Sequence, residues 1–146
     1  MPHLSSKYGL RGPIVEVWVG VSEPRRRLMR QLGQDAPAAV LRQLLIDSGC
    51  DTTTISDMYL RSLGVPVRGA TEIRTATTDA YATTCDTFDV ELRISPFEGA
   101  PYVLPAIEVI GRPFHNEMID GLLARDVLDT FMFTLDGPNK RFMIQY

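Results

Sequence analysis

A strict alternation of apolar and polar side chains constrains the fold of this chain more than any other feature. In Ile14–Val21, four valines occupy every second position, with Glu16 and Trp18 on the other face. In Phe88–Ile94, apolar residues again alternate with charged ones. Because successive side chains of a β-strand point to opposite faces of a sheet, both segments are predicted to be strands with one buried face.

Further segments add strands and short helices. Val40–Ile46 is predicted to be a strand buried on both faces, because it ends in three consecutive apolar residues. Val67–Ile94 is predicted to form a long hairpin with its tip at residues 77–80. The other expected elements are a short helix from Ser56 to Gly64, an edge strand over residues 102–110 that Pro105 interrupts, a short helix near residues 123–131 and a terminal hairpin over residues 133–146. Many strands and two short helices indicate the all-β class.

Residues 22–37 interrupt this pattern with a polar and basic stretch. Three consecutive arginines begin at Arg25, and no apolar period persists. We interpret the stretch as an excursion between two strands, with a helical turn near residues 28–32. A run of basic residues is most often a solvated face, so no binding role is predicted for it.

Length and charge limit the classes of protein to be considered. The 146 residues, 45% of them apolar, are enough for one domain over residues 1–146. A net charge of -3 disfavours nucleic acid, whose phosphates need a cationic partner. No stretch approaches the ~20 apolar residues of a spanning helix, and the N-terminus lacks an apolar signal core. We therefore expect a cytoplasmic protein with neither nucleic acid nor a membrane as partner.

The residue types also exclude several kinds of site. The chain has two cysteines, Cys50 and Cys85, and two histidines, His3 and His115, so one chain cannot form a four-thiolate zinc site. Neither a phosphate-binding glycine loop nor a G-x-S-x-G elbow is present. A protease that pairs Cys50 with His115 is an alternative, but a cysteine after an apolar strand is better explained as a small packed residue.

The most informative motif begins where the strand at Val40–Ile46 ends. Asp47, Ser48 and Gly49 follow the apolar run, and a second acid, Asp51, precedes three threonines. Asp-Ser-Gly alone is a weak signal that fits any strand ending in a tight turn. The whole segment, however, resembles the active-site loop of retropepsin-like aspartic proteases, in which hydrophobic residues precede Asp, Thr or Ser, Gly, Ala, an acid and Thr.

A second motif supports this resemblance. Residues 121–126, Gly-Leu-Leu-Ala-Arg-Asp, are similar to the late motif of the same family, in which hydrophobic residues precede Gly, Arg and Asp or Asn before the C-terminal helix. Residues 12–17 and the terminal hairpin resemble bacterial members more weakly. Because two motifs in the right order are more specific than one, the resemblance implies an all-β, retropepsin-like acid protease fold of the bacterial type.

The resemblance implies roles for the matching residues of the first motif. Asp47 matches the catalytic aspartate. Ser48 matches the hydroxyl residue that bonds across to the partner's loop, and Gly49 matches the glycine whose backbone lies against the substrate. The sequence contains one such motif, whereas aspartic proteolysis needs two carboxylates that share a proton. The second carboxylate is therefore expected from another copy in a symmetric homodimer.

Other matching residues would support this loop. Asp51 and Arg125 match an acid and a base that form an ion pair in retroviral members, and Asp126 matches the polar residue that ties the helix to the threonine loop. An ordinary helix start with exposed charges is the alternative for residues 125 and 126. Ala124 stands where the family usually has glycine, and its methyl group could crowd the cleft.

The expected flap departs from the family pattern as well. The candidate substrate-binding residues Thr78, Asp79, Ala80 and Tyr81 lie in a segment without glycine, whereas retroviral flaps are rich in glycine. Tyr81 could close over a substrate, or pack against a neighbouring strand. The expected function is an aspartic endopeptidase that cleaves peptides or proteins without metal or cofactor. The alternative is a catalytically weak or inactive peptide-binding or dimerisation module with the same fold.

Overall fold

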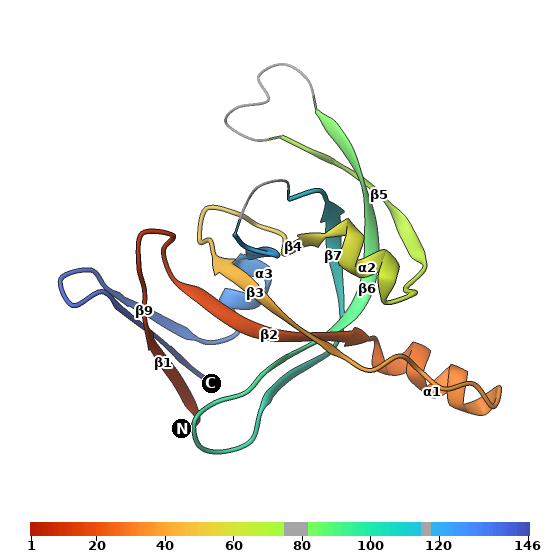
Figure 1. Cartoon of the computed structure of the whole chain (residues 1–146), viewed down its shortest axis with the longest axis horizontal. Coiled ribbons are helices and arrows are strands. Elements are labelled where there is room, and N and C mark those ends of the chain that lie inside the picture. Colours follow the sequence, from red (N-terminus) through yellow and green to blue (C-terminus); the bar gives the residue numbers. More distant parts are fainter. Residues whose placement is uncertain (75–81, 115–117) are drawn as a thin grey trace.

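A computed structural model describes residues 1–74, 82–114 and 118–146, and strands dominate them (Figure 1). The strands are β1 (His3–Lys7), β2 (Ile14–Val21), β3 (Val40–Ile46), β4 (Thr54–Ser56), β5 (Val67–Ile73), β6 (Thr83–Ile94), β7 (Tyr102–Arg112), β8 (Gly121–Leu123), β9 (Met132–Asp136) and β10 (Arg141–Gln145). The helices are α1 (Glu23–Gln31), α2 (Asp57–Ser62) and α3 (Arg125–Leu128). The all-β prediction is confirmed.

Seven of these strands form one sheet that closes on itself. Their order is β2-β3-β8-β4-β7-β6-β5, and β2 also pairs with β6 through residues 18–21 and 90–93. Within the described residues β5 pairs with β6 alone and continues the sheet as its outer strand (Figure 1). The closed strands enclose the core, whose fully buried side chains include Val15, Val17, Leu44, Ile55, Phe88, Leu92 and Leu123.

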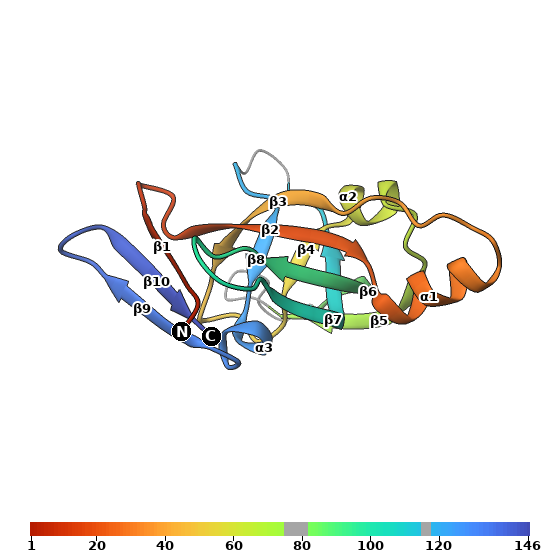
Figure 2. The same cartoon turned by 90° about the horizontal axis from the view of Figure 1, so that it is seen from below.

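The two ends of the chain form a second, antiparallel sheet with the order β1-β10-β9. Phe142 and Ile144 of β10 are buried and join the main core. Figure 2 shows this sheet at one end of the molecule and α1 at the other. The terminal hairpin predicted from residues 133–146 is confirmed, whereas β1 was not predicted.

The alternating segments fold as expected. β2 and β3 have the predicted bounds, and the four valines of β2 are buried. In β3, however, burial on both faces is limited to the end that lies between β2 and β8, where Leu44 and Ile46 are buried and Leu45 is half-buried. The expectation that the whole strand is buried was wrong.

Two other expectations need correction. β7 lies between β4 and β6 rather than at an edge. Pro105 is tolerated because the pairing of β7 with β4 involves residues 110–112, away from this proline, and because the β6–β7 register shifts close to it. In the basic stretch, the structure has a third helix, α1, instead of a single turn at residues 28–32. Pro24 in its first turn favours helix initiation, and Glu23 and Arg30 suit the helix dipole.

Candidate active site

Asp47 is placed by β3, by β4 shortly after it, and by β8, which is distant in the sequence. β3 runs parallel to β8, and the N–H of Asp47, the first residue after β3, donates to the carbonyl oxygen of Leu123 at 2.9 Å. The chain then returns as β4, which pairs with β8 in the antiparallel direction. Gly121 makes this close packing possible, because a Cβ atom there would overlap the carbonyl oxygen of Thr54.

Backbone hydrogen bonds tie the loop of residues 47–53 to the start of α3. The N–H of Arg125 donates to the carbonyl oxygen of Cys50 at 3.0 Å, and the N–H of Asp126 donates to that of Asp51 at 3.3 Å. The loop thus stays in contact with the segment of the second sequence motif. The structure brings together the two motifs, whose bonded residues are 75 positions apart in the sequence.

A buried threonine forms the centre of this contact. Thr53 has no exposed surface, and its hydroxyl donates to Oδ1 of Asp126 at 2.6 Å. The same hydroxyl accepts the N–H of Ala124 at 3.1 Å, and the N–H of Thr53 donates to Oδ2 of Asp126 at 2.9 Å. Asp126 therefore ties the helix to the threonine loop. The sequence did not identify Thr53 as its partner, because the three threonines of the run are equivalent in the pattern.

The expected ion pair between Asp51 and Arg125 is not found. Both residues are exposed, and within residues 1–74, 82–114 and 118–146 no ion pair involves either of them. The loop is braced by the backbone bonds of these residues instead of by their charged groups. The alternative of exposed charges at the start of the helix describes Arg125 correctly.

The carboxylate of Asp47 is half-buried and is oriented by its own loop. Its Oδ1 atom accepts the N–H of Gly49 at 2.9 Å, while Ser48 and Gly49 are exposed. Asp47 and Gly49 line a cleft of about 730 Å³. An exposed glycine next to a positioned carboxylate leaves room for an extended peptide backbone.

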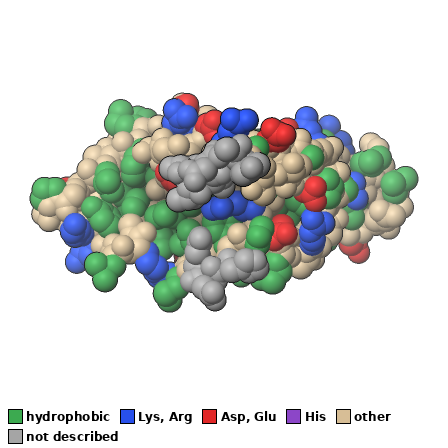
Figure 3. Space-filling model, turned by 90° about the horizontal axis from the view of Figure 1, so that it is seen from above, with side chains coloured by type: hydrophobic (Ala, Val, Ile, Leu, Met, Phe, Trp, Pro, Cys, Tyr) green, Lys and Arg blue, Asp and Glu red, His purple; other side chains and the backbone are tan. Residues whose placement is uncertain are grey.

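The far side of this cleft comes from β5, β7 and β8. The lining residues outside the loop are Thr54, Thr71, Glu72, Ile73, Arg74, Ile110, Arg112 and Leu122. The expected flap residues, Thr78, Asp79, Ala80 and Tyr81, lie outside the described residues, but β5 leads towards them and lines the cleft. Figure 3 shows the molecule from this side, where acidic and basic side chains are interspersed with apolar ones.

Cys50 lines the same cleft. Burial raises the pKa of this thiol, a hydrogen bond with the backbone of Thr52 opposes the shift, and the charges of Asp47 and Asp51 raise the pKa further. The thiol also donates to the carbonyl oxygen of Thr52 at 3.2 Å. A thiol with a raised pKa is a poor nucleophile at neutral pH. This weakens the alternative of a cysteine protease, whose expected histidine, His115, lies outside the described residues.

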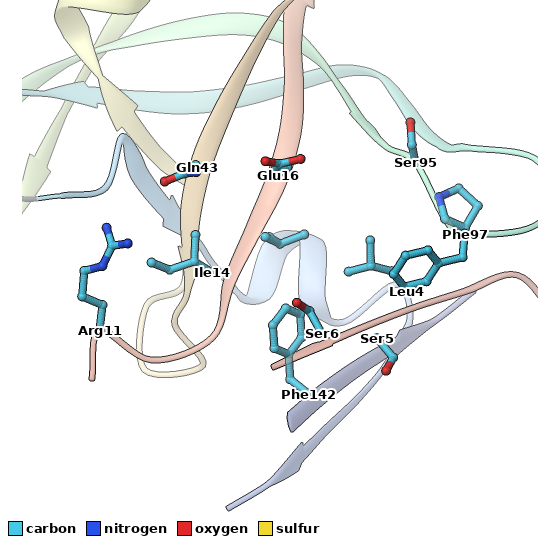
Figure 4. A pocket seen from close by; sticks show the side chains of 12 residues that line it. Leu4, Ser5, Ser6, Arg11, Ile14, Glu16, Gln43, Ser95, Phe97 and Phe142 are labelled. Atoms are coloured by element: carbon cyan, nitrogen blue, oxygen red, sulfur yellow. The ribbon is translucent and has the colours of Figure 1, made fainter. Parts of the chain in front are cut away.

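A second cavity, of about 440 Å³, lies between β1 and the strands β2 and β3 (Figure 4). Glu16 is its one carboxylate, and neither histidine nor cysteine lines it. In the part of the chain that the structure describes, no three His, Cys, Asp or Glu side chains are close enough to hold a metal ion, and no helix could span a membrane. The cleft at Asp47 is therefore the better candidate for a catalytic site.

Comparison with known proteins supports the fold assignment. No family model and no curated protein matches the chain. Among solved structures, a retropepsin-like aspartic protease from Rickettsia conorii matches 99% of this chain and 90% of its own, with a TM-score of 0.60 and 12% identity. The retroviral protease-like domain of Ddi1 from Leishmania major covers 90% of this chain and 88% of its own, with a TM-score of 0.43 and 14% identity. The chain has the retropepsin-like fold.

Proposed function

We propose that this chain is an aspartic endopeptidase that acts as a homodimer on peptides or proteins in the cytoplasm. The observation that carries the proposal is the Asp47 carboxylate, which is held by the N–H of Gly49 at 2.9 Å and lies beside a cleft of about 730 Å³. The retropepsin-like fold supports it, because this fold is the scaffold of the Rickettsia conorii protease. A cleft of this size is in the range of small-molecule and short-peptide sites.

The proposed chemistry requires two Asp47 side chains that share one proton. Two carboxylates at close range do not both ionise, so one remains protonated. The ionised carboxylate takes a proton from a water molecule as the water oxygen bonds to the peptide carbon, and the protonated one gives its proton to the carbonyl oxygen. When this intermediate collapses, the C–N bond breaks, the first carboxyl group gives the proton that it took from water to the leaving nitrogen, and the second carboxylate takes a proton back from a hydroxyl of the intermediate. The products are a carboxylic acid and an amine.

The terminal sheet offers a surface for the second copy. With the order β1-β10-β9, β9 has one edge without a neighbouring strand among the described residues, and the outer edge of β1 makes a single bridge there, from His3 to Glu98. Met132 and Leu135 of β9 are 62% and 52% exposed. Exposed strand edges with apolar side chains are usually covered in a stable protein. Ser48 is exposed as well, as a residue that bonds to the partner's loop must be.

The test is the Asp47→Asn variant, incubated with a peptide library beside the wild type. We expect cleavage by the wild type and none by the variant, because the amide retains the shape but cannot act as the base. The variant should keep the melting temperature of the wild type. Equal cleavage by both proteins would refute the assignment of Asp47. If the wild type binds peptides but cleaves none, the chain is a binding module.

The shared pair can be tested by mixing the two proteins. A hybrid of one wild-type and one Asp47→Asn chain has a single carboxylate, so excess variant should suppress the wild-type activity once subunits exchange. A mixed-label assay shows whether they exchange. Activity that follows only the amount of wild-type chain, despite exchange, would contradict a shared pair.

Ala124 does not by itself favour the inactive module. Its φ of -103° is a conformation that any residue adopts, so the backbone does not demand glycine at this position. The N–H of Ala124 donates to the hydroxyl of Thr53, and the side chain of Ala124 is fully buried. The structure accommodates the methyl group that the sequence suggested could crowd the cleft.

A further inference from the structure

The proposed protease chemistry makes no use of α1, the most basic segment of the chain. Four of its nine residues are arginines. Figures 1 and 2 show it at the end of the molecule opposite the β1-β10-β9 sheet. Residues 22–39 contain these four arginines against Glu23 and Asp35, a net charge of +2, which leaves a net charge of -5 for the rest of the chain. The charge of the molecule is therefore strongly asymmetric along its length.

The inner side of α1 is fixed to the body. Arg26 pairs with the buried Glu91 of β6 at 2.8 Å and donates to the carbonyl oxygen of Val21 at 3.0 Å. Met29 packs against the core. These contacts hold α1 in one orientation, with the side of Arg26 and Met29 facing the body and the opposite side facing away from it.

The outer side combines a free cation with apolar side chains. Leu28 and Leu32 are 50% and 65% exposed and, at a spacing of four residues, lie on one side of the helix. Arg25 lies beside them, three residues before Leu28, and is exposed without an ion pair within the described residues. Arg30 is also exposed and unpaired there, but it lies on the same side of the helix as Arg26. An exposed apolar pair with a guanidinium group beside it is typical of helices that lie at the surface of a bilayer.

We propose that α1 docks this protein on an anionic lipid bilayer, with Leu28 and Leu32 in the acyl boundary, Arg25 at the headgroups, and Arg30 adding to the positive charge of this end. The charge asymmetry sets the orientation, because an anionic surface attracts this end and repels the rest of the molecule. An acidic peptide or a nucleic acid would account for the arginines but not for the exposed leucines. From the sequence we expected that a membrane is not a partner, because no stretch is long and apolar enough to span a bilayer, but docking at the surface does not require such a stretch.

The test is cosedimentation of the whole chain with vesicles of phosphatidylcholine, alone or mixed with phosphatidylglycerol. We expect binding only to the anionic vesicles, and weaker binding as salt is added. Arg25→Gln with Arg30→Gln should reduce the partition coefficient about twenty-five-fold, because each arginine near an anionic surface contributes about a fivefold factor. Leu28→Ser with Leu32→Ser should also reduce it, since these side chains enter the acyl boundary.

The matched control removes the same charge from the other end of the molecule. Lys7→Gln with Arg141→Gln changes two exposed residues of the β1-β10-β9 sheet. This pair should alter binding by less than about twofold, because it lies beyond the reach of a screened surface charge. Equal losses from both pairs, no loss from the leucine changes, or no binding to anionic vesicles would each overturn the proposal. Vesicle binding does not depend on cleavage, so the result is independent of the proposed protease activity.

Discussion

Replacing Thr53 with valine tests whether one buried hydroxyl holds the active-site loop to the C-terminal helix. Valine has nearly the same shape, so the change removes two hydrogen bonds without opening a large cavity. One is the 2.6 Å bond from Thr53 to the carboxylate of Asp126, and the other is the 3.1 Å bond that Thr53 accepts from the N–H of Ala124. The bond from the N–H of Thr53 to Asp126 remains.

The magnitude follows from these two bonds. A hydrogen bond to a charged group contributes about 1.5 to 3 kcal/mol to stability, and a buried N–H without an acceptor costs about 1 to 3 kcal/mol. The two effects overlap, because both arise at one hydroxyl. We therefore expect the free energy of unfolding to fall by about 3 kcal/mol, and the melting temperature of a chain of this size to fall by about 10 °C.

Urea unfolding of Thr53→Val and of Thr54→Val provides the measurement and its control. Thr54 is also buried, but its hydroxyl only donates to the carbonyl oxygen of Thr52 at 3.2 Å. Its removal leaves no buried N–H without an acceptor, so a loss of about 1 kcal/mol is expected. Equal losses from the two variants would show that the contact with Asp126 and Ala124 has no special role in stability.

Three further predictions concern the surroundings of the loop. Gly121→Ala should destabilise the protein by about 3 kcal/mol in urea unfolding, because the methyl group would overlap Thr54, whereas Gly9→Ala should not, since nothing lies within 4 Å of its Cβ position. Arg125→Ala should lower the free energy of unfolding by no more than about 1 kcal/mol, because this side chain is exposed and forms no ion pair within the described residues. A larger loss in urea unfolding would contradict this exposed position. In a Cys85→Ser background, alkylation of Cys50 should accelerate with pH and still be rising at pH 9.0, because burial raises the pKa of the thiol; a plateau near pH 8 would contradict this.

Local patterns were sufficient for the elements that bury one face along their whole length. The alternation in β2 fixes which side chains are buried, and it extends over eight residues, so both its bounds and its inner face were predicted. β4 and β8 have three residues each, too few to show an alternation. They are strands because distant neighbours accept and donate their backbone hydrogen bonds. Such short strands depend on long-range pairing that no local pattern shows.

The first turn of α1 carried recognisable signals, but its stability comes from elsewhere. Pro24 and Glu23 are typical of a helix start, yet no residue of the helix is fully buried and the apolar period is weak. The ion pair that anchors it joins Arg26 to Glu91, sixty-five residues away in the sequence. An ion pair between residues so far apart cannot be predicted from the sequence of the helix alone. For this reason only one helical turn was expected.

The site shows the same division between local and long-range information. The motif places Asp47 because a strand must end there and a tight turn must follow. The resemblance correctly identified Asp126 as a tie between the helix and the threonine loop, but the ion pair that it implied between Asp51 and Arg125 is not found within the described residues. An exposed ion pair contributes little to stability, so the fold can form without it. The backbone bonds to the carbonyl groups of Cys50 and Asp51, in contrast, can form with any side chain at these positions. The buried hydroxyl of Thr53 is different, because its removal leaves a buried N–H without an acceptor. Backbone bonds of the loop and the buried contact of Thr53 with Asp126, rather than an ion pair between Asp51 and Arg125, therefore determine where Asp47 lies.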